Sequence, residues 1–267
     1  MIKTIFASVL LLMLATPGIG QADESGEQSA RFRLGWEKLK EIDGEAGERV
    51  IAGLKDISPD LGRYIIEYVF GDVYPRPGLD LKSKEIAVVA SLTAMGNAVP
   101  QLKVHLNAAL NVGCTVHEVH EVILQMAVYS GFPSAINSMN AFQEVLLERR
   151  GHGVQDPQGK PPAAAIEKKA ADRQETGASR LGELDPLQTE RLNRGLGAIS
   201  PDLVRYILEF AYGDVLIRPG LTLKQRQIAT IAALAAMGTA ASQLKFHIVG
   251  GLRAGLSREN IREIMIL

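Results

Sequence analysis

The sequence contains little cysteine, few aromatic residues and no excess of either charge. Cys114 is the single cysteine among 267 residues, so a framework of intrachain disulfides is excluded. Aromatic side chains make up 5% of the chain, and 29 basic residues stand against 30 acidic ones without a long basic run. This balance gives no sign of a positively charged surface that could bind nucleic acid, and we expect no nucleic-acid partner.

Long hydrophobic runs are also missing, apart from one at the amino end. Residues 1–22 combine Lys3, an apolar run that is short for a membrane span, and the small residues Gly20 and Ala22 at positions suited to cleavage. We interpret this segment as a signal peptide and expect a periplasmic or secreted protein with no other membrane segment. An uncleaved amino-terminal anchor is the alternative.

One segment of the chain is present twice. Residues 57–125 match residues 199–267 at a constant offset of 142, with about half of the positions identical, and this period is far too long for a solenoid repeat. A stretch rich in Gly, Pro, Ala and charge separates the copies and is typical of a linker. We therefore expect a first domain at 31–150, a linker at 151–172 and a second domain at 173–267. Since Leu267 stands opposite Gln125, the second domain is expected to be incomplete at its carboxyl end.

Both copies are predicted to be all-α. Segments such as KEIAVVASLTAM carry apolar residues at helical spacing, whereas alternation at strand spacing is rare. Ser58-Pro59 and Ser200-Pro201 are typical helix starts. We expect Gly71 and Gly213 to end the helices that begin there.

A helical hairpin that bends at Gly96 supplies the best candidate for chemistry. Counted outward at about 1.5 Å per residue, Glu85 on one arm and His105 on the other lie nearly level, so their side chains can meet. A carboxylate fixes the tautomer of an imidazole and raises its basicity, which suits proton transfer near neutral pH. We predict that Glu85 and His105 are catalytic. The alternative is a histidine that is merely hydrogen-bonded within a core.

The second copy tests this interpretation, because His105 recurs as His247 whereas Glu85 becomes Gln227. A glutamine can hold an imidazole by a hydrogen bond but cannot accept its proton. We therefore expect the first copy to be the more active one.

Other polar residues recur at equivalent positions. Arg76 and Arg218 lie in the turn before each hairpin, where a guanidinium could bind a substrate carboxylate or could tie the turn to a neighbouring helix end. Gln101 and Gln243 precede the two histidines by one helical turn, and we expect them to line the same pockets.

His117, His120 and Cys114 are poorer candidates. The two histidines resemble metal-ligand spacing, but the second copy has Glu259 and Arg262 there, so we expect a solvated helix face and no metal. Cys114 becomes a leucine in the second copy, which favours a role as a small buried hydrophobe. No cofactor is expected.

The stretch from RPGLDLKSKEIAVVASL to NAFQEVL, residues 76–146, resembles the carboxymuconolactone decarboxylase family, which is related to the AhpD-type alkylhydroperoxidases. The segment YSGFP at 129–133 is especially typical. The resemblance implies helical domains that assemble into rings, commonly trimers of pairs, with the pocket at subunit contacts, so that a homo-oligomer of three tandem chains is expected. It also implies that Glu85 and His105 are the acid and the histidine of the decarboxylase branch. Arg76 would then hold a small carboxylate substrate.

The resemblance covers two kinds of reaction. The peroxidase branch needs a Cys-x-x-Cys pair shortly before the histidine, and those positions are Ala98 and Gln101, or Ala240 and Gln243 in the second copy. The resemblance therefore favours a cofactor-independent decarboxylase-like enzyme for a small unsaturated carboxylic acid or lactone. The alternatives are a peroxidase that uses Cys114 with an external thiol, and a non-catalytic helical module for ligand binding or assembly.

Overall fold

The computed structural model describes residues 29–161 and 170–267, and all regular secondary structure within these ranges is helical. The all-α prediction is confirmed. The predicted signal peptide at 1–22 lies outside the described residues. Among the helices of the described ranges, none combines the length and the apolar character required to cross a membrane.

The helices follow the duplication. The first copy comprises α1 (Ala30–Ile42), α2 (Glu45–Leu54), α3 (Pro59–Tyr64), the π-helix η1 (Ile65–Val73), α4 (Leu81–Met95), α5 (Val99–Asn111) and α6 (Val116–Gly151). The second comprises α7 (Ala170–Leu184), α8 (Gln188–Leu196), α9 (Pro201–Tyr206), the π-helix η2 (Ile207–Val215), α10 (Leu223–Met237), α11 (Ala241–Arg253) and α12 (Arg258–Ile266). Helix α7 thus begins within the predicted linker, whose alanines and charged residues are compatible with a helix.

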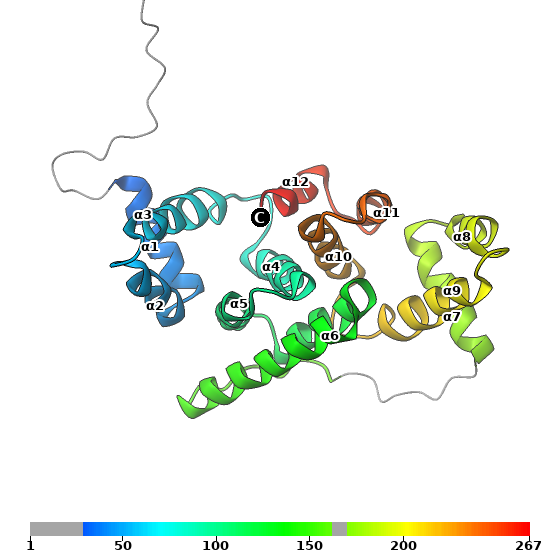
Figure 1. The fold of residues 1–267 in the computed structure, drawn as a ribbon, viewed down its shortest axis with the longest axis horizontal. Helices are drawn as coiled ribbons and strands as arrows, with labels where there is room; N and C mark the ends of the chain where they lie inside the picture. The colour runs from blue at the N-terminus through cyan, green and yellow to red at the C-terminus, as the bar shows by residue number, and fades with distance from the viewer. Residues whose placement is uncertain (1–28, 162–169) are drawn as a thin grey trace, which may run out of the picture.

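The two copies meet in a central bundle. Figure 1 shows α4 and α10 side by side at the centre, with α5 and α6 on one side and α11 and α12 on the other. A single apolar core runs through both copies, because Ile86 and Ala90 of α4 pack in one cluster with Ile228 and Ala232 of α10. The tandem copies therefore fold as one unit around a shared core.

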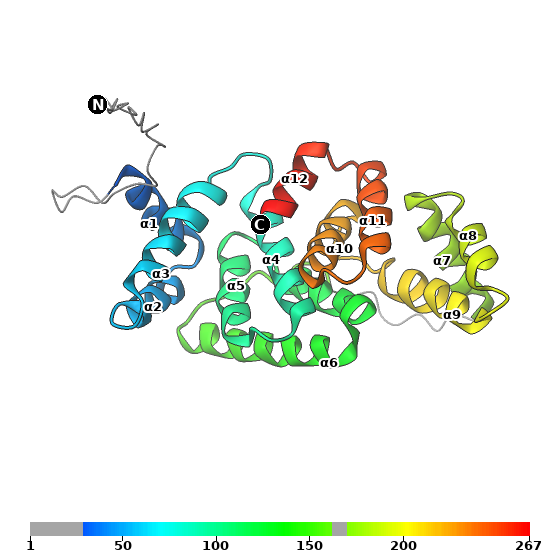
Figure 2. The same ribbon diagram turned by 45° about the horizontal axis from the view of Figure 1, so that its top comes forward.

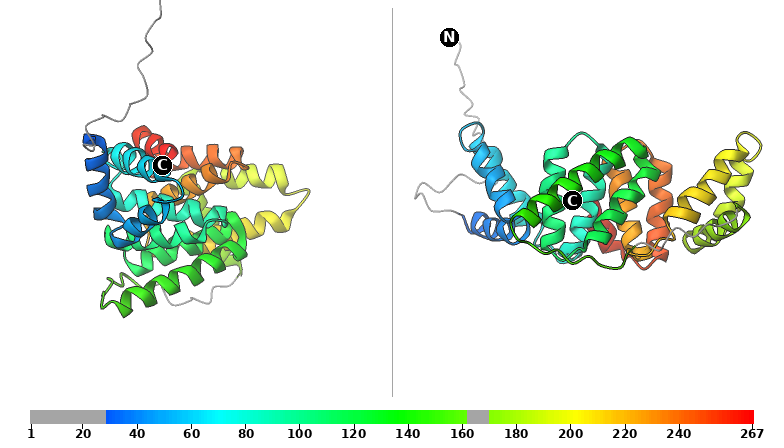
Figure 3. Two further views of the ribbon diagram at one scale, coloured as in Figure 1. Left: turned by 60° about the vertical axis from the view of Figure 1, so that its left-hand side comes forward. Right: turned by 90° about the horizontal axis from the view of Figure 1, so that it is seen from below.

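The amino-terminal helices of each copy lie outside this bundle. Figure 2 shows α1–α3 at one end of the molecule and α7–α9 at the other, and the view from below in Figure 3 places them as two arms on opposite sides of the bundle. The long helix α6 runs beneath α4 and α5, with a break at Gly131, whose φ of 85° and ψ of 164° are not helical.

The expectation that Gly71 and Gly213 end their helices is wrong. Both lie inside the π-helices η1 and η2, which continue to Val73 and Val215. A Cβ atom on Gly71 would lie 2.9 Å from the carbonyl oxygen of Arg31, and one on Gly35 would lie 2.0 Å from that of Ile66. These glycines are needed because α1 packs against the backbone of η1, and this contact is what positions the end of α1 near the candidate site.

Candidate active site

The predicted hairpin forms and carries the candidate pair. Asp80 caps the start of α4 by accepting a hydrogen bond from the backbone N–H of Ser83 (2.8 Å). Helix α4 ends at Gly96, whose φ of 69° is left-handed and suits glycine, and α5 returns from Val99. This return path places His105 opposite Glu85.

Glu85 and His105 are in direct contact, as the hairpin geometry predicts. The Nδ1 atom of His105 lies 3.0 Å from Oε2 of Glu85, and the hydroxyl of Tyr74 donates to Oε1 at 2.5 Å. Glu85 is completely buried, and each of its oxygens serves as an acceptor. Because a carboxylate only accepts, Nδ1 carries the imidazole hydrogen, and Nε2 is the nitrogen that remains for chemistry.

The surroundings favour the protonated imidazole. Burial lowers the pKa of His105, but the charge of Glu85, its hydrogen bond and the charge of Asp43 outweigh burial, so the pKa is raised. Burial, together with the charge of Glu85, raises the pKa of Tyr74 well above its usual value, which keeps the phenol a neutral donor. The side chain of His105 retains 20% of its exposure, whereas Glu85 has none. The histidine is therefore the member of the pair that a substrate can reach.

A buried lysine fixes the turn that carries Tyr74. Lys84 donates from Nζ to the backbone carbonyls of Tyr74 (2.7 Å) and Arg76 (2.6 Å). Burial lowers the pKa of this ammonium group, although charges nearby partly oppose the effect. Since Lys84 directly precedes Glu85, the same turn of α4 positions both the acid and the tyrosine that binds it.

The equivalent site of the second copy is neutral. Nδ1 of His247 lies 2.9 Å from Oε1 of Gln227, and Leu216 stands where the first copy has Tyr74. The hydroxyl of Tyr129, from the first copy, lies 3.5 Å from Nε2 of His247. Burial lowers the pKa of His247 to about 3, and the residue is only 4% exposed. This imidazole stays uncharged at neutral pH and is covered by its neighbours.

The sequence leaves two roles open for Arg76 and Arg218, and the structure shows the one that ties the turn to a helix. Arg76 binds both carboxylate oxygens of Glu263 on α12, at 2.7 to 3.1 Å. Arg218 binds Glu121 on α6 in the same way, at 2.8 to 3.1 Å. Each arginine reaches the other copy at an equivalent position, so the two pairs are related by a pseudo-twofold axis. Both bidentate ion pairs join the first copy to the second.

In the part of the chain that the structure describes, the remaining candidate residues, two glutamines and a cysteine, take no part in the hydrogen bonds around His105 and His247. Gln101 and Gln243 are exposed on the first turns of α5 and α11, and within the described residues neither joins the hydrogen bonds around the histidines. Cys114 is buried, and burial raises the pKa of its thiol to about 12. A thiol in this state is a poor nucleophile, which agrees with its predicted role as a buried hydrophobe.

Sequence reasoning missed Tyr74, although a signal was present. Tyr74 becomes Leu216 in the second copy, in parallel with the change of Glu85 to Gln227. The two replacements remove the hydrogen-bond donor and the acid that it binds, so the copies differ as a set and not at a single position.

Comparison with known proteins agrees with the predicted resemblance. The sequence model of the carboxymuconolactone decarboxylase family matches residues 59–144 and 201–267, which together exceed half of the chain. A 4-carboxymuconolactone decarboxylase of Acinetobacter baylyi is 33% identical over 119 residues, which are 44% of this chain and 88% of the relative. A nitrosuccinic acid decarboxylase of Metarhizium robertsii is 35% identical over 82 residues, 31% of this chain and 57% of the relative. An uncharacterized 15.0 kDa protein of Paracoccus denitrificans is 30% identical over 127 residues, 47% and 87% of the two chains.

Proposed function

Because the chain belongs to the carboxymuconolactone decarboxylase family, we propose that its first copy is a cofactor-independent decarboxylase site for a small unsaturated carboxylic acid or lactone. The observation that carries the proposal is the buried Glu85, which holds Nδ1 of a partly exposed His105 at 3.0 Å. Two of the similar proteins are named as decarboxylases of small acids, and this supports the same class of substrate.

In the proposed reaction His105 is the general acid. The bond between the carboxylate carbon and its neighbour breaks, carbon dioxide leaves, and the electron pair delocalises into the unsaturated system as a dienolate. The proton on Nε2 of the His105 imidazolium then passes to carbon, and the ring becomes neutral. Glu85 keeps the ring oriented and stabilises its charged form, while Tyr74 holds Glu85 in place. Arg76 has no part in this scheme because Glu263 occupies its guanidinium.

A non-catalytic role fits the second copy better. Gln227 cannot take up a proton, and the imidazole of His247 is buried and held neutral by its low pKa of about 3. We propose that this copy supports the first one through the shared core and the two arginine–glutamate pairs. The peroxidase alternative is disfavoured, since Cys114 is buried with a raised thiol pKa of about 12.

The release of carbon dioxide tests the proposed function. The panel of acids should include carboxymuconolactone, nitrosuccinate and related unsaturated lactone and keto acids. We expect turnover of at least one of them, and we expect Glu85→Gln to lower its rate by at least about tenfold, because an amide does not stabilise the imidazolium. Glu144→Gln, an exposed glutamate paired with Lys103, serves as the charge-matched control and should retain activity. Release from none of the acids, or a fully active Glu85→Gln variant, would contradict the proposal.

We also propose that the protein is a homo-oligomer of three tandem chains. Exposed apolar residues at equivalent positions of the two arms support this: Ile57, Leu61 and Tyr64 in the first, and Ile199, Leu203 and Tyr206 in the second. Tyr68 extends the exposed apolar surface of the first arm. Exposed apolar patches of this kind mark surfaces for association, and their placement on two opposite arms allows a ring to close.

Light scattering provides the test of assembly. We expect three times the chain mass for the wild type, and dissociation when Tyr64→Glu and Tyr206→Glu are combined, because charges would be placed in the contact. Leu147→Glu on α6, also an exposed apolar position, should leave the mass unchanged. A monomeric wild type at micromolar concentration would refute a stable ring.

A further inference from the structure

Asp43 is a buried acid that the Glu85–His105 pair does not explain. It follows the last residue of α1 and is 5% exposed. Its Oδ1 atom is buried without a hydrogen-bond partner in the described part of the chain. A buried carboxyl oxygen without a hydrogen-bond partner is costly to the fold, so its presence needs a reason.

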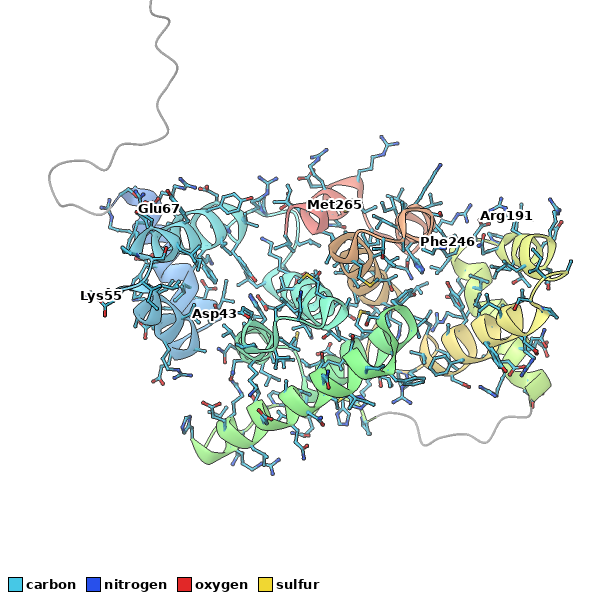
Figure 4. The ribbon with its side chains drawn as sticks, in the orientation of Figure 1. Asp43, Lys55, Glu67, Arg191, Phe246 and Met265 are labelled. Carbon is cyan, nitrogen blue, oxygen red and sulfur yellow. The ribbon has the colours of Figure 1, made fainter. Side chains whose placement is uncertain are left out.

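The fold holds Asp43 on the side of α1 that faces the site. The side chain of Asn111 on α5 donates to the carbonyl of Ile42 at 3.0 Å, which ties the end of α1 to α5. Ile42 also packs in one cluster with Tyr74 and with Ala108, which lies one turn after His105 on α5. Figure 4 shows Asp43 on the side of the amino-terminal helices that faces α5.

The charges around Asp43 come from the site itself. Burial raises its pKa, the charge of His105 lowers it and that of Glu85 raises it, and the result is a pKa of about 7. The charge of Asp43 in turn raises the pKa of both His105 and Tyr74. Two cations on the neighbouring elements are engaged elsewhere. Lys38 of α1 binds Glu41 at 2.6 Å, and Arg49 of α2 lies 3.7 Å from Glu45.

The second copy pairs the same aspartate with cations. Asp185, the equivalent of Asp43, accepts a hydrogen bond from the backbone N–H of Leu187 at 3.1 Å and binds Arg191 and Arg253. The hydrogen bond from Leu187 makes the largest contribution to lowering the pKa of Asp185. In the first copy the position of Arg253 is occupied by Asn111. The charge of the acid is therefore compensated by arginines in the copy that has lost Glu85, whereas within the described residues no arginine or lysine pairs with it in the copy that retains Glu85.

We propose that Asp43 is a positioning residue of the first site, a carboxyl group whose charged form stabilises the imidazolium of His105. Asp43 and His105 then titrate as a coupled pair, because the charge that Asp43 gains on losing its proton raises the pKa of the His105 ring. The coupling keeps the imidazole protonated at a higher pH and so extends the range in which it can deliver a proton to carbon. This inference rests on the proposed function for its purpose, but the coupling itself can be measured without a substrate.

The titration of the His105 ring by NMR tests the coupling in the full-length chain. In Asp43→Asn, which keeps the shape and removes the charge, we expect the midpoint of the His105 titration to move to lower pH. Asp185→Asn is the matched control at the equivalent position and should leave that midpoint where it is in the wild type. An unchanged midpoint in Asp43→Asn would overturn the proposal, whether or not a substrate has been found.

Unfolding as a function of pH gives a second, independent readout. An acid whose pKa is raised from 3.8 to about 7 on folding contributes stability that is fully present below pH 3.8 and is lost as the pH rises through about 7. The wild type should therefore lose thermal stability over this range relative to Asp43→Asn. Parallel stability curves would mean that burial does not raise the pKa of Asp43 on folding, which contradicts the premise that Asp43 is a buried acid without a compensating arginine or lysine among the described residues. If a substrate is known, the alkaline limb of kcat should move to lower pH in Asp43→Asn, an effect that a purely structural role would not produce.

Discussion

Replacement of His105 by asparagine is expected to lower the rate of carbon dioxide release by about two to four orders of magnitude, the usual contribution of a general acid. The amide nitrogen of asparagine takes the place of Nδ1 and can still donate to Glu85, which preserves the contact observed at 3.0 Å. The variant lacks a group that titrates near neutral pH and has nothing in the position of Nε2. The decrease in rate should consequently appear in kcat, and the fold should remain intact.

His247→Asn is the matched control for this experiment. His247 makes the equivalent contact with Gln227 at 2.9 Å, but burial lowers its pKa to about 3 and leaves it 4% exposed. We expect its replacement to leave the rate nearly unchanged. Equal losses in both variants would show that the second copy is also catalytic, and full activity of His105→Asn would exclude His105 as the proton donor. Circular dichroism of both variants checks that the helices are retained.

Replacement of Glu121 by glutamine is expected to reduce the free energy of unfolding by about 3–5 kcal/mol, the usual cost of leaving a buried charge without its partner. Glu121 on α6 is almost fully buried and accepts from Arg218 at 2.8 Å and from Arg226 at 3.0 Å. Arg226 has no exposed surface. Burial by itself would raise the pKa of Glu121, but the imidazole of His120, whose Nδ1 lies 3.5 Å from Oε1, and the hydrogen bonds from these two arginines lower it to about 2.

Glu263→Gln, at the equivalent position of the second copy, provides the comparison. Glu263 binds Arg76, whose side chain is 38% exposed, so water can solvate the guanidinium after the partner is removed. The loss should be smaller, about 1.5–3 kcal/mol, as for a hydrogen bond to a charged group. Urea denaturation of both variants measures the difference. Equal losses at the two positions would show that the burial of Arg226 does not matter, and no loss in Glu121→Gln would contradict the account of the interface.

The two copies have diverged as complete sets of interactions. The first retains Tyr74, Glu85 and Asp43 around His105, and no arginine or lysine of the described residues pairs with Asp43. The second has Leu216 and Gln227 in place of the first two and pairs Asp185 with arginines. The core and the arginine–glutamate pairs are shared. This pattern is what we expect if one copy carries the chemistry and the other completes the structure.

The sequence by itself determined the helical class, the duplication and the hairpin that joins Glu85 to His105, because these depend on local periodicity and on the fixed rise of a helix. The tertiary structure decided which further groups surround that pair. Tyr74 and Asp43 come from the turn before α4 and from the end of α1, and their positions depend on how η1 and α1 pack. Arg76 had two possible roles until α12 of the other copy placed Glu263 beside it, since a guanidinium binds whichever carboxylate the fold brings within reach.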